Sequence, residues 1–214
     1  VNAWMKDNSG FFYTGYPPVE KGQELKAQTF YQKVYFHKLG TPQSEDYVVY
    51  ERPDNKEYFS SVEISEDGNW LIIYVGKGTE RMNMIYFKNL ATQKGAIMPL
   101  IENLENDWNF LGNDGSVFYF QTDKNASRGK IVKVDVLTKE KVWSDVVPES
   151  VDTLGNVSFI NNQFVLNYLH DASTLIKIYK TSGKFIRDVK LPGIGSAGGF
   201  GGKRSYTEAF YSYS

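Results

Sequence analysis

Hydrophobic residues along the chain form short runs separated by polar turns. The stretch Ser61–Leu90 shows the plan, with an alternating run, an Asp67-Gly68 turn, the aromatic and β-branched run Trp70–Val75, a polar loop and a further run. Asp-Gly supplies the positive φ of a tight hairpin turn, and β-branched and aromatic side chains suit a pleated, half-buried surface. The pattern therefore predicts an antiparallel meander.

The same plan recurs along the chain. Strands that follow turns are predicted at Phe11–Tyr13, Leu71–Tyr74, Val117–Phe120, Phe164–Leu166 and Ala209–Tyr211. Third strands are predicted at Lys33–Leu39, Met84–Leu90, Lys130–Val136 and Leu175–Lys180. Fourth strands are predicted at Asp46–Glu51, Ala96–Ile101, Val142–Val147 and Phe185–Leu191. Four strands in each unit of about 40–50 residues are typical of β-propeller blades.

We therefore expect an all-β fold, a partial β-propeller with about four four-stranded antiparallel blades and half a blade. The predicted blades are residues 1–52, 58–102, 106–148 and 152–192, with a partial blade at 194–214. The last unit has only two predicted strands, so the chain resembles a slice of a longer one, because a closed ring must cover its edges. An ordinary β-sandwich of similar hairpins is the alternative.

Composition narrows the class of protein. The chain has 214 residues with 41% hydrophobic and 15% aromatic content, enough for a sizeable β-rich core. Its net charge of −1 and the absence of long Lys/Arg runs argue against nucleic acid as a partner. No apolar run reaches the roughly 18–20 residues that span a bilayer, so we expect no membrane association. The absence of Cys excludes thiolate chemistry; we expect a cytoplasmic location, with the periplasm as the alternative.

One segment resembles a known family. Gln32–Glu51, with the sequence QKVYFHKLGTPQSEDYVVYE, is similar to the propeller domain of the prolyl oligopeptidase (prolyl endopeptidase) family. Supporting matches follow in family order at Gly10–Tyr13, Ser65–Gly68, Gly115–Phe118 and Asn167–Asp171. The likeness runs from Trp4 to Tyr211, which is nearly the whole chain.

The resemblance implies a function for the intact protein. Members combine an α/β-hydrolase domain, which cuts short peptides after proline, with a seven-bladed propeller that caps the active site. The partners implied are the hydrolase domain of the same protein and proline-containing oligopeptides. The family's catalytic Ser, Asp and His lie in the hydrolase domain, and the Gly-x-Ser-x-Gly of a strained nucleophile turn is absent here. By position, Phe59 and Thr79 would lie beside the substrate pocket, where members commonly carry Met and Cys.

Other residues could suggest chemistry but are better explained by structure. His37 and His170 are expected to be hydrogen-bonded strand-end residues, and Asp171 to serve a turn. Gly193–Gly198 matches the dinucleotide fingerprint, yet the glycines that follow would not start a helix. No cofactor is expected, and no His/Asp/Glu cluster, including Glu102, Glu105 and Asp107, has metal-ligand spacing. The tryptophans, Trp4, Trp70, Trp108 and Trp143, are expected in blade cores.

Two functions follow for the intact protein. The first is a serine peptidase in which this chain filters substrates without catalysing cleavage. The second is a non-enzymatic propeller that binds a protein partner across its loop face. The polar insertion Pro17–Gln32 is expected to be a solvated flap or a contact at the propeller rim.

Overall fold

The fold was analysed in a computed structural model, which describes residues 2–18, 22, 29–92 and 95–214. Nearly all regular structure among them is β; the short 3-10 helix η1 spans Gln43–Glu45. The strands form four antiparallel four-stranded sheets and one two-stranded sheet. The chain divides into two compact units, Val1–Asn106 and Asp107–Ser214.

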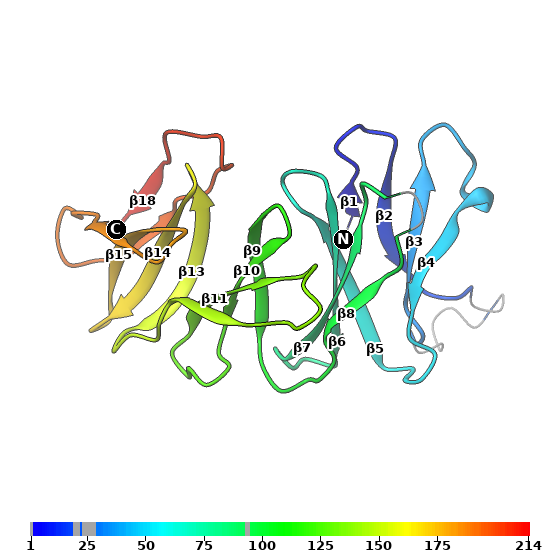
Figure 1. The fold of residues 1–214 in the computed structure, drawn as a ribbon, viewed down its shortest axis with the longest axis horizontal. Helices are drawn as coiled ribbons and strands as arrows, with labels where there is room; N and C mark the ends of the chain where they lie inside the picture. The colour runs from blue at the N-terminus through cyan, green and yellow to red at the C-terminus, as the bar shows by residue number, and fades with distance from the viewer. Residues whose placement is uncertain (1, 19–21, 23–28, 93–94) are drawn as a thin grey trace. The chain divides into compact units, whose positions relative to one another are not determined.

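The first unit contains two sheets whose strands lie side by side in chain order (Figure 1). The first sheet consists of β1 (Asn2–Trp4), β2 (Gly10–Gly15), β3 (Lys33–Lys38) and β4 (Tyr47–Glu51). The second sheet consists of β5 (Tyr58–Ile64), β6 (Trp70–Lys77), β7 (Asn83–Asn89) and β8 (Met98–Ile101). Each successive pair is an antiparallel hairpin, as the repeated plan predicts.

The second unit repeats this arrangement and adds a short pair of strands. The third sheet consists of β9 (Trp108–Asp114), β10 (Val117–Thr122), β11 (Lys130–Asp135) and β12 (Ser144–Val147). The fourth sheet consists of β13 (Thr153–Ile160), β14 (Gln163–His170), β15 (Ser173–Lys180) and β16 (Phe185–Asp188). The fifth consists of β17 (Ala197–Gly199) and β18 (Tyr211–Tyr213). Each four-stranded sheet holds four consecutive strands in chain order, without the Greek-key crossings between sheets that are typical of a β-sandwich.

The hairpin turns form where the sequence places residues that tolerate a left-handed backbone. Gly68 has φ of 80° and its amide donates to the Ser65 carbonyl at 2.8 Å, which closes the turn between β5 and β6. Asn161 and Asn162 have φ of 49° and 53°, the combination that matches the twist of a two-residue hairpin. These turns set which residues face the core, since a slip of one residue would reverse the faces.

The cores lie between the faces of successive sheets within each unit. In the first unit, buried side chains of both sheets meet; they are Ala3, Phe12, Val34, Val62, Leu71, Ile73, Val75 and Met84. In the second unit, one cluster joins the third and fourth sheets; it contains Tyr119, Ile131, Val146, Val147, Leu154, Phe159, Phe164, Leu166 and Tyr168. A smaller cluster of Ile176, Ala197 and Phe200 joins the fourth and fifth sheets.

The tryptophans differ in their burial. Trp70 and Trp108 are buried, but Trp4 is 50% exposed, so its predicted place in a core is wrong. The reason is alternation along β1: Ala3 points into the core of the first unit, and Trp4 therefore points to the other face, where its ring contacts Phe11. Most of the predicted insertion Pro17–Gln32 lies outside the described residues.

Candidate functional site

Phe59 has an unusual seat at one end of the second sheet. It is the second residue of β5 and pairs in register with Gly76 of β6. A Cβ atom on residue 76 would lie 2.7 Å from the tip of the Phe59 ring, so the ring lies against the space left by the missing side chain. Phe59 remains 37% exposed. The contact thus presents an aromatic surface whose position is fixed by the backbone beneath it.

Thr79 lies at the same end of the second sheet. It lies two residues after Lys77, the last residue of β6. Lys77 pairs with Tyr58 at the start of β5. The side chain of Thr79 is exposed in the turn between β6 and β7. The structure therefore brings both sequence-predicted pocket residues to one end of one sheet, Phe59 on a strand and Thr79 on the adjoining loop.

A partly buried carboxyl group lies farther along the face that carries Phe59. Glu63 is four residues after Phe59 on β5, and the hydroxyl of Tyr74 donates a hydrogen bond to its Oε1. Burial raises the pKa of Glu63 above its ordinary value, and the bond from Tyr74 partly opposes that rise. The role of Glu63 is not apparent from the sequence, because alternation alone does not distinguish a partly buried carboxylate from a solvated one.

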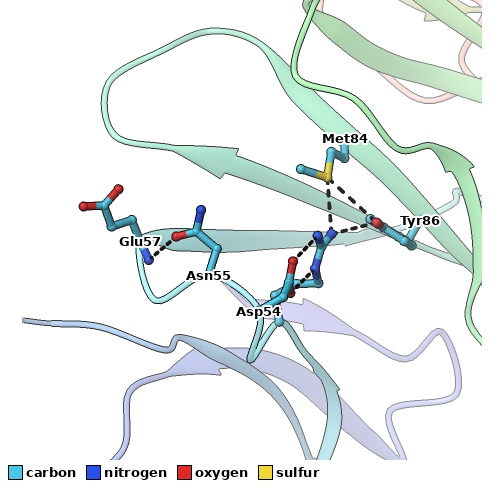
Figure 2. A network of polar contacts seen from close by, with 6 residues as sticks. Asp54, Asn55, Glu57, Met84 and Tyr86 are labelled. Carbon is cyan, nitrogen blue, oxygen red and sulfur yellow. Dashed lines mark hydrogen bonds and ion pairs between the residues drawn. The ribbon is translucent and has the colours of Figure 1, made fainter.

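Arg52 lies on the connection between β4 and β5 and is the centre of a polar network. Figure 2 shows its partners Asp54, Met84 and Tyr86. Its Nε and Nη2 donate to the two carboxylate oxygens of Asp54, each at 2.7 Å, and its Nη1 donates to the Tyr86 hydroxyl at 2.7 Å. Its guanidinium carbon is 4.9 Å from the ring centroid of Tyr58. The network fixes the segment that leads into β5 and hence into Phe59. Sequence analysis missed it, since Arg52 and Tyr86 are far apart in sequence.

His37 is held by a carboxylate that the sequence did not reveal. Its Nδ1 lies 2.7 Å from Asp46 Oδ1, and the Tyr13 hydroxyl donates to Asp46 Oδ2 at 2.6 Å. The bond from Tyr13, followed by that from His37, lowers the pKa of Asp46. The expectation of a hydrogen-bonded structural histidine fits this arrangement. Asp46, the residue that follows η1, is thereby held to β2 and β3.

His170 has a similar partner in the fourth sheet. Its Nδ1 lies 2.7 Å from Asp152 Oδ1, whereas the Nε2 to Asp171 Oδ2 distance is 3.7 Å, too long for a hydrogen bond. Asp171 has φ of 42° and occupies the turn after β14, as expected. The hydrogen bond with Asp152 raises the pKa of His170, and the charges of Asp152 and Asp171 add to the effect.

Two further sequence candidates are the glycine-rich segment before β18 and the carboxylates between β8 and β9. The glycine-rich segment Gly193–Gly198 leads into strand β17 instead of a helix, so it lacks the helix N-terminus that a pyrophosphate needs. Within residues 2–18, 22, 29–92 and 95–214, no group of three or more His, Asp or Glu side chains could hold a metal ion. Glu105 accepts a hydrogen bond from the Asn103 side chain.

Comparison with known proteins identifies the family. The model of the family described as "Prolyl oligopeptidase, N-terminal beta-propeller domain" matches residues 2–214. The chain belongs to this family. Its membership confirms the resemblance seen in Gln32–Glu51, and with the four antiparallel four-stranded sheets it confirms the all-β, partial-propeller fold class.

Relatives of the prolyl oligopeptidase propeller family match almost the whole chain. It is 35% identical over 99% of its length to a prolyl endopeptidase of Elizabethkingia miricola, and 26% identical over 91% to prolyl oligopeptidase A of Galerina marginata. It spans 30% and 28% of the lengths of these two relatives. The chain thus corresponds to less than a third of each relative.

Solved structures agree with the sequence matches. One, from a study of two prolyl endopeptidases and the role of inter-domain dynamics, superposes with a TM-score of 0.89 and 31% identity over 100% of this chain. Prolyl oligopeptidase B of Galerina marginata, bound to a 35mer substrate, gives a TM-score of 0.89 and 26% identity over 99% of the chain. Each match covers 30% of the solved chain. In the described part of the present chain, no helix meets the length and hydrophobicity of a membrane span.

Replacing Arg52 with Met should lower the free energy of unfolding by about 1–3 kcal/mol, because the part-buried Tyr86 hydroxyl loses its charged partner. Asp54→Asn is the matched control. Its carboxylate is 55% exposed, so its loss should cost less than about 1 kcal/mol. Urea unfolding of both variants compares the two values. Equal losses would mean that the exposed ion pair, and not the contact with Tyr86, fixes this connection.

His170 should titrate above pH 6.5, the ordinary pKa of a histidine, in an NMR titration of the folded protein. Asp152→Asn should lower its midpoint by removing the main hydrogen-bond partner. Because the folded pKa is raised, the stabilisation from this pair is complete below the ordinary pKa and disappears as the pH rises through the raised value. A midpoint that is unchanged in Asp152→Asn would contradict the assignment.

Proposed function

We propose that the intact protein containing this chain is a serine peptidase that cleaves short peptides after proline, and that this chain is part of its substrate-filtering propeller. The observation that carries the proposal is the family match across residues 2–214. The propeller comprises blades at about residues 1–52, 58–102, 106–148 and 152–192, with a partial blade at 194–214. The catalytic Ser, Asp and His belong to an α/β-hydrolase domain outside this chain, which is its main partner.

In this proposal the chain acts by shape and does not react with the peptide. A ring of blades that encloses a central channel keeps folded proteins from the acyl-transfer site and admits short, flexible chains. The sheets suit this role because their packed faces are held by large side chains, among them Phe12, Phe164 and Tyr168, and resist deformation. Proline-containing oligopeptides are the substrates. The cytoplasm is the proposed location, with the periplasm as the alternative.

Phe59 and Thr79 are the proposed substrate-adjacent residues. The support is their shared position at one end of the second sheet and the exposed aromatic face of Phe59. An aromatic ring seated on Gly76 loses little conformational freedom when a peptide contacts it, so it would act as a preorganised apolar contact. Thr79 would add a hydroxyl that can donate or accept a hydrogen bond.

Turnover of a blocked Gly-Pro reporter by the full-length protein tests the proposed activity. We expect cleavage after proline by the full-length protein and none by residues 1–214 alone, because this chain contains no Gly-x-Ser-x-Gly nucleophile turn. A proline-containing folded protein, used as a competitor, should inhibit much less than an unfolded peptide of the same sequence. Absence of reporter turnover by the full-length protein would favour the non-enzymatic scaffold instead.

Phe59→Ala should raise KM about tenfold for peptides extended on the N-terminal side of proline, which corresponds to about 1.4 kcal/mol of lost contact. The kcat for a minimal Gly-Pro reporter should change little. Gly76→Ala should act in the same direction, since the new methyl group displaces the Phe59 ring. Met98→Ala is the control, because Met98 is 50% exposed on β8, at the opposite edge of the second sheet. An equal effect of Met98→Ala would argue against a role for Phe59.

A further inference from the structure

Arg204 contacts the hairpin turns of two different sheets in the second unit. It lies on the connection between β17 and β18. Its Nη2 is 2.5 Å from Asp114 Oδ1, and its Nη1 donates to the carbonyl of Asn113; both residues end β9, next to the turn to β10. Its Nε and Nη2 donate to Asn162 Oδ1 at 3.0 Å and 2.6 Å, in the turn from β13 to β14. One guanidinium group thus links the third, fourth and fifth sheets.

The aromatic ring beneath Arg204 completes this contact. The guanidinium carbon lies 4.3 Å from the centroid of the Phe159 ring. Phe159 is itself seated on Gly112, where a Cβ atom would approach the ring to 2.7 Å. A planar cation stacked on an aromatic face while its edges donate hydrogen bonds is a geometry that arginine provides and lysine does not.

The groups that accept hydrogen bonds from Arg204 are also held by contacts within their own sheets. The Tyr119 hydroxyl donates to Asp114 Oδ2 at 2.9 Å, which leaves Oδ1 for Arg204. The Asn113 side chain donates to the Gly115 carbonyl at 2.9 Å, within the same turn. Asn162 occupies a left-handed turn position with φ of 53°. Because these groups are ordered by their own sheets, binding Arg204 costs mainly the freedom of the connection that carries it.

The fifth sheet has few other attachments. Its strands are three residues each, and the buried residues in or next to them are Ala197 and Phe200. The Asn167 side chain donates to the Ala197 carbonyl at 3.0 Å, and the Ala197 amide donates to Thr174 Oγ1 at 3.0 Å, so these bonds hold the start of β17. Phe200, with φ of 57°, is in a left-handed conformation that is unfavourable for an aromatic residue. That strain must be offset by contacts around the connection.

We propose that Arg204 is a clamp that holds the connection between β17 and β18 against the turns of the third and fourth sheets. The clamp makes the fifth sheet move with the fourth sheet instead of opening independently. Without it, the short strands β17 and β18 retain their mutual pairing, the hydrogen bonds of Ala197 with Asn167 and Thr174, and the small cluster around Ile176. The clamp is a positioning device, and its effect is on the local opening of residues 200–213.

Hydrogen exchange of the full-length protein, followed by mass spectrometry of its peptides, tests the clamp. In Arg204→Lys and Arg204→Ala, amides in residues 200–213 should exchange about tenfold faster, corresponding to about 1.4 kcal/mol of lost local stability. Amides of β14 and β15 should keep their wild-type rates. Arg187→Lys, at an exposed arginine on β16, should leave both regions unchanged.

A second test of the clamp changes its acceptor, Asp114, instead of Arg204. Asp114→Asn keeps the shape of the acceptor but loses its charge, and it should accelerate exchange in residues 200–213 although Asp114 lies in the third sheet. Combined with Arg204→Ala, its effect should be less than additive, because both changes remove the same contact. Unchanged exchange in residues 200–213, strict additivity, or equal acceleration in β14 and β15 would each overturn the proposal.

Discussion

The structure depends on the need of each sheet to bury its faces against another sheet. A four-stranded antiparallel sheet of three-to-eight-residue strands cannot hide its aromatic and β-branched side chains by itself. In the first unit, Val34 of the first sheet and Leu71 of the second are both fully buried in one core. In the second unit, Tyr119 and Phe164 meet across the third and fourth sheets with ring centroids 5.3 Å apart.

The polar groups with the largest structural consequences lie at the ends of the sheets, where backbone pairing stops. Arg52, Asp46 and Arg204 all join a loop to a neighbouring strand or turn. A long side chain with several donors, or a carboxylate with several acceptor positions, can tie two segments that have no backbone hydrogen bonds in common. Aromatic packing therefore sets the sheets, and charged side chains fix the connections between them.

Much of the fold was predictable from the sequence because its signals are local. Asp67-Gly68 and Asn161-Asn162 mark hairpins, and the aromatic and β-branched runs that follow turns identify Leu71 and Phe118 as strand residues. The partners of His37, His170 and Arg204 were not predictable, because no local signal marks a contact between distant segments. Arg204 and Asp114, for example, are 90 positions apart. Trp4 was wrongly predicted to lie in a core because it is a tryptophan. In β1 the side chains alternate, so Ala3 faces the core and Trp4 faces away from it.

Because the Phe59 ring packs directly on Gly76, the side-chain sizes allowed at these two positions depend on each other. Any side chain at residue 76 must occupy the space that the ring now uses, and a smaller residue at 59 would leave that space open to solvent. In evolution or in protein engineering, we therefore expect the side-chain volumes at positions 59 and 76 to change together. A larger group at 76 is tolerable only together with a smaller or more flexible one at 59, so that either residue predicts the bulk of the other.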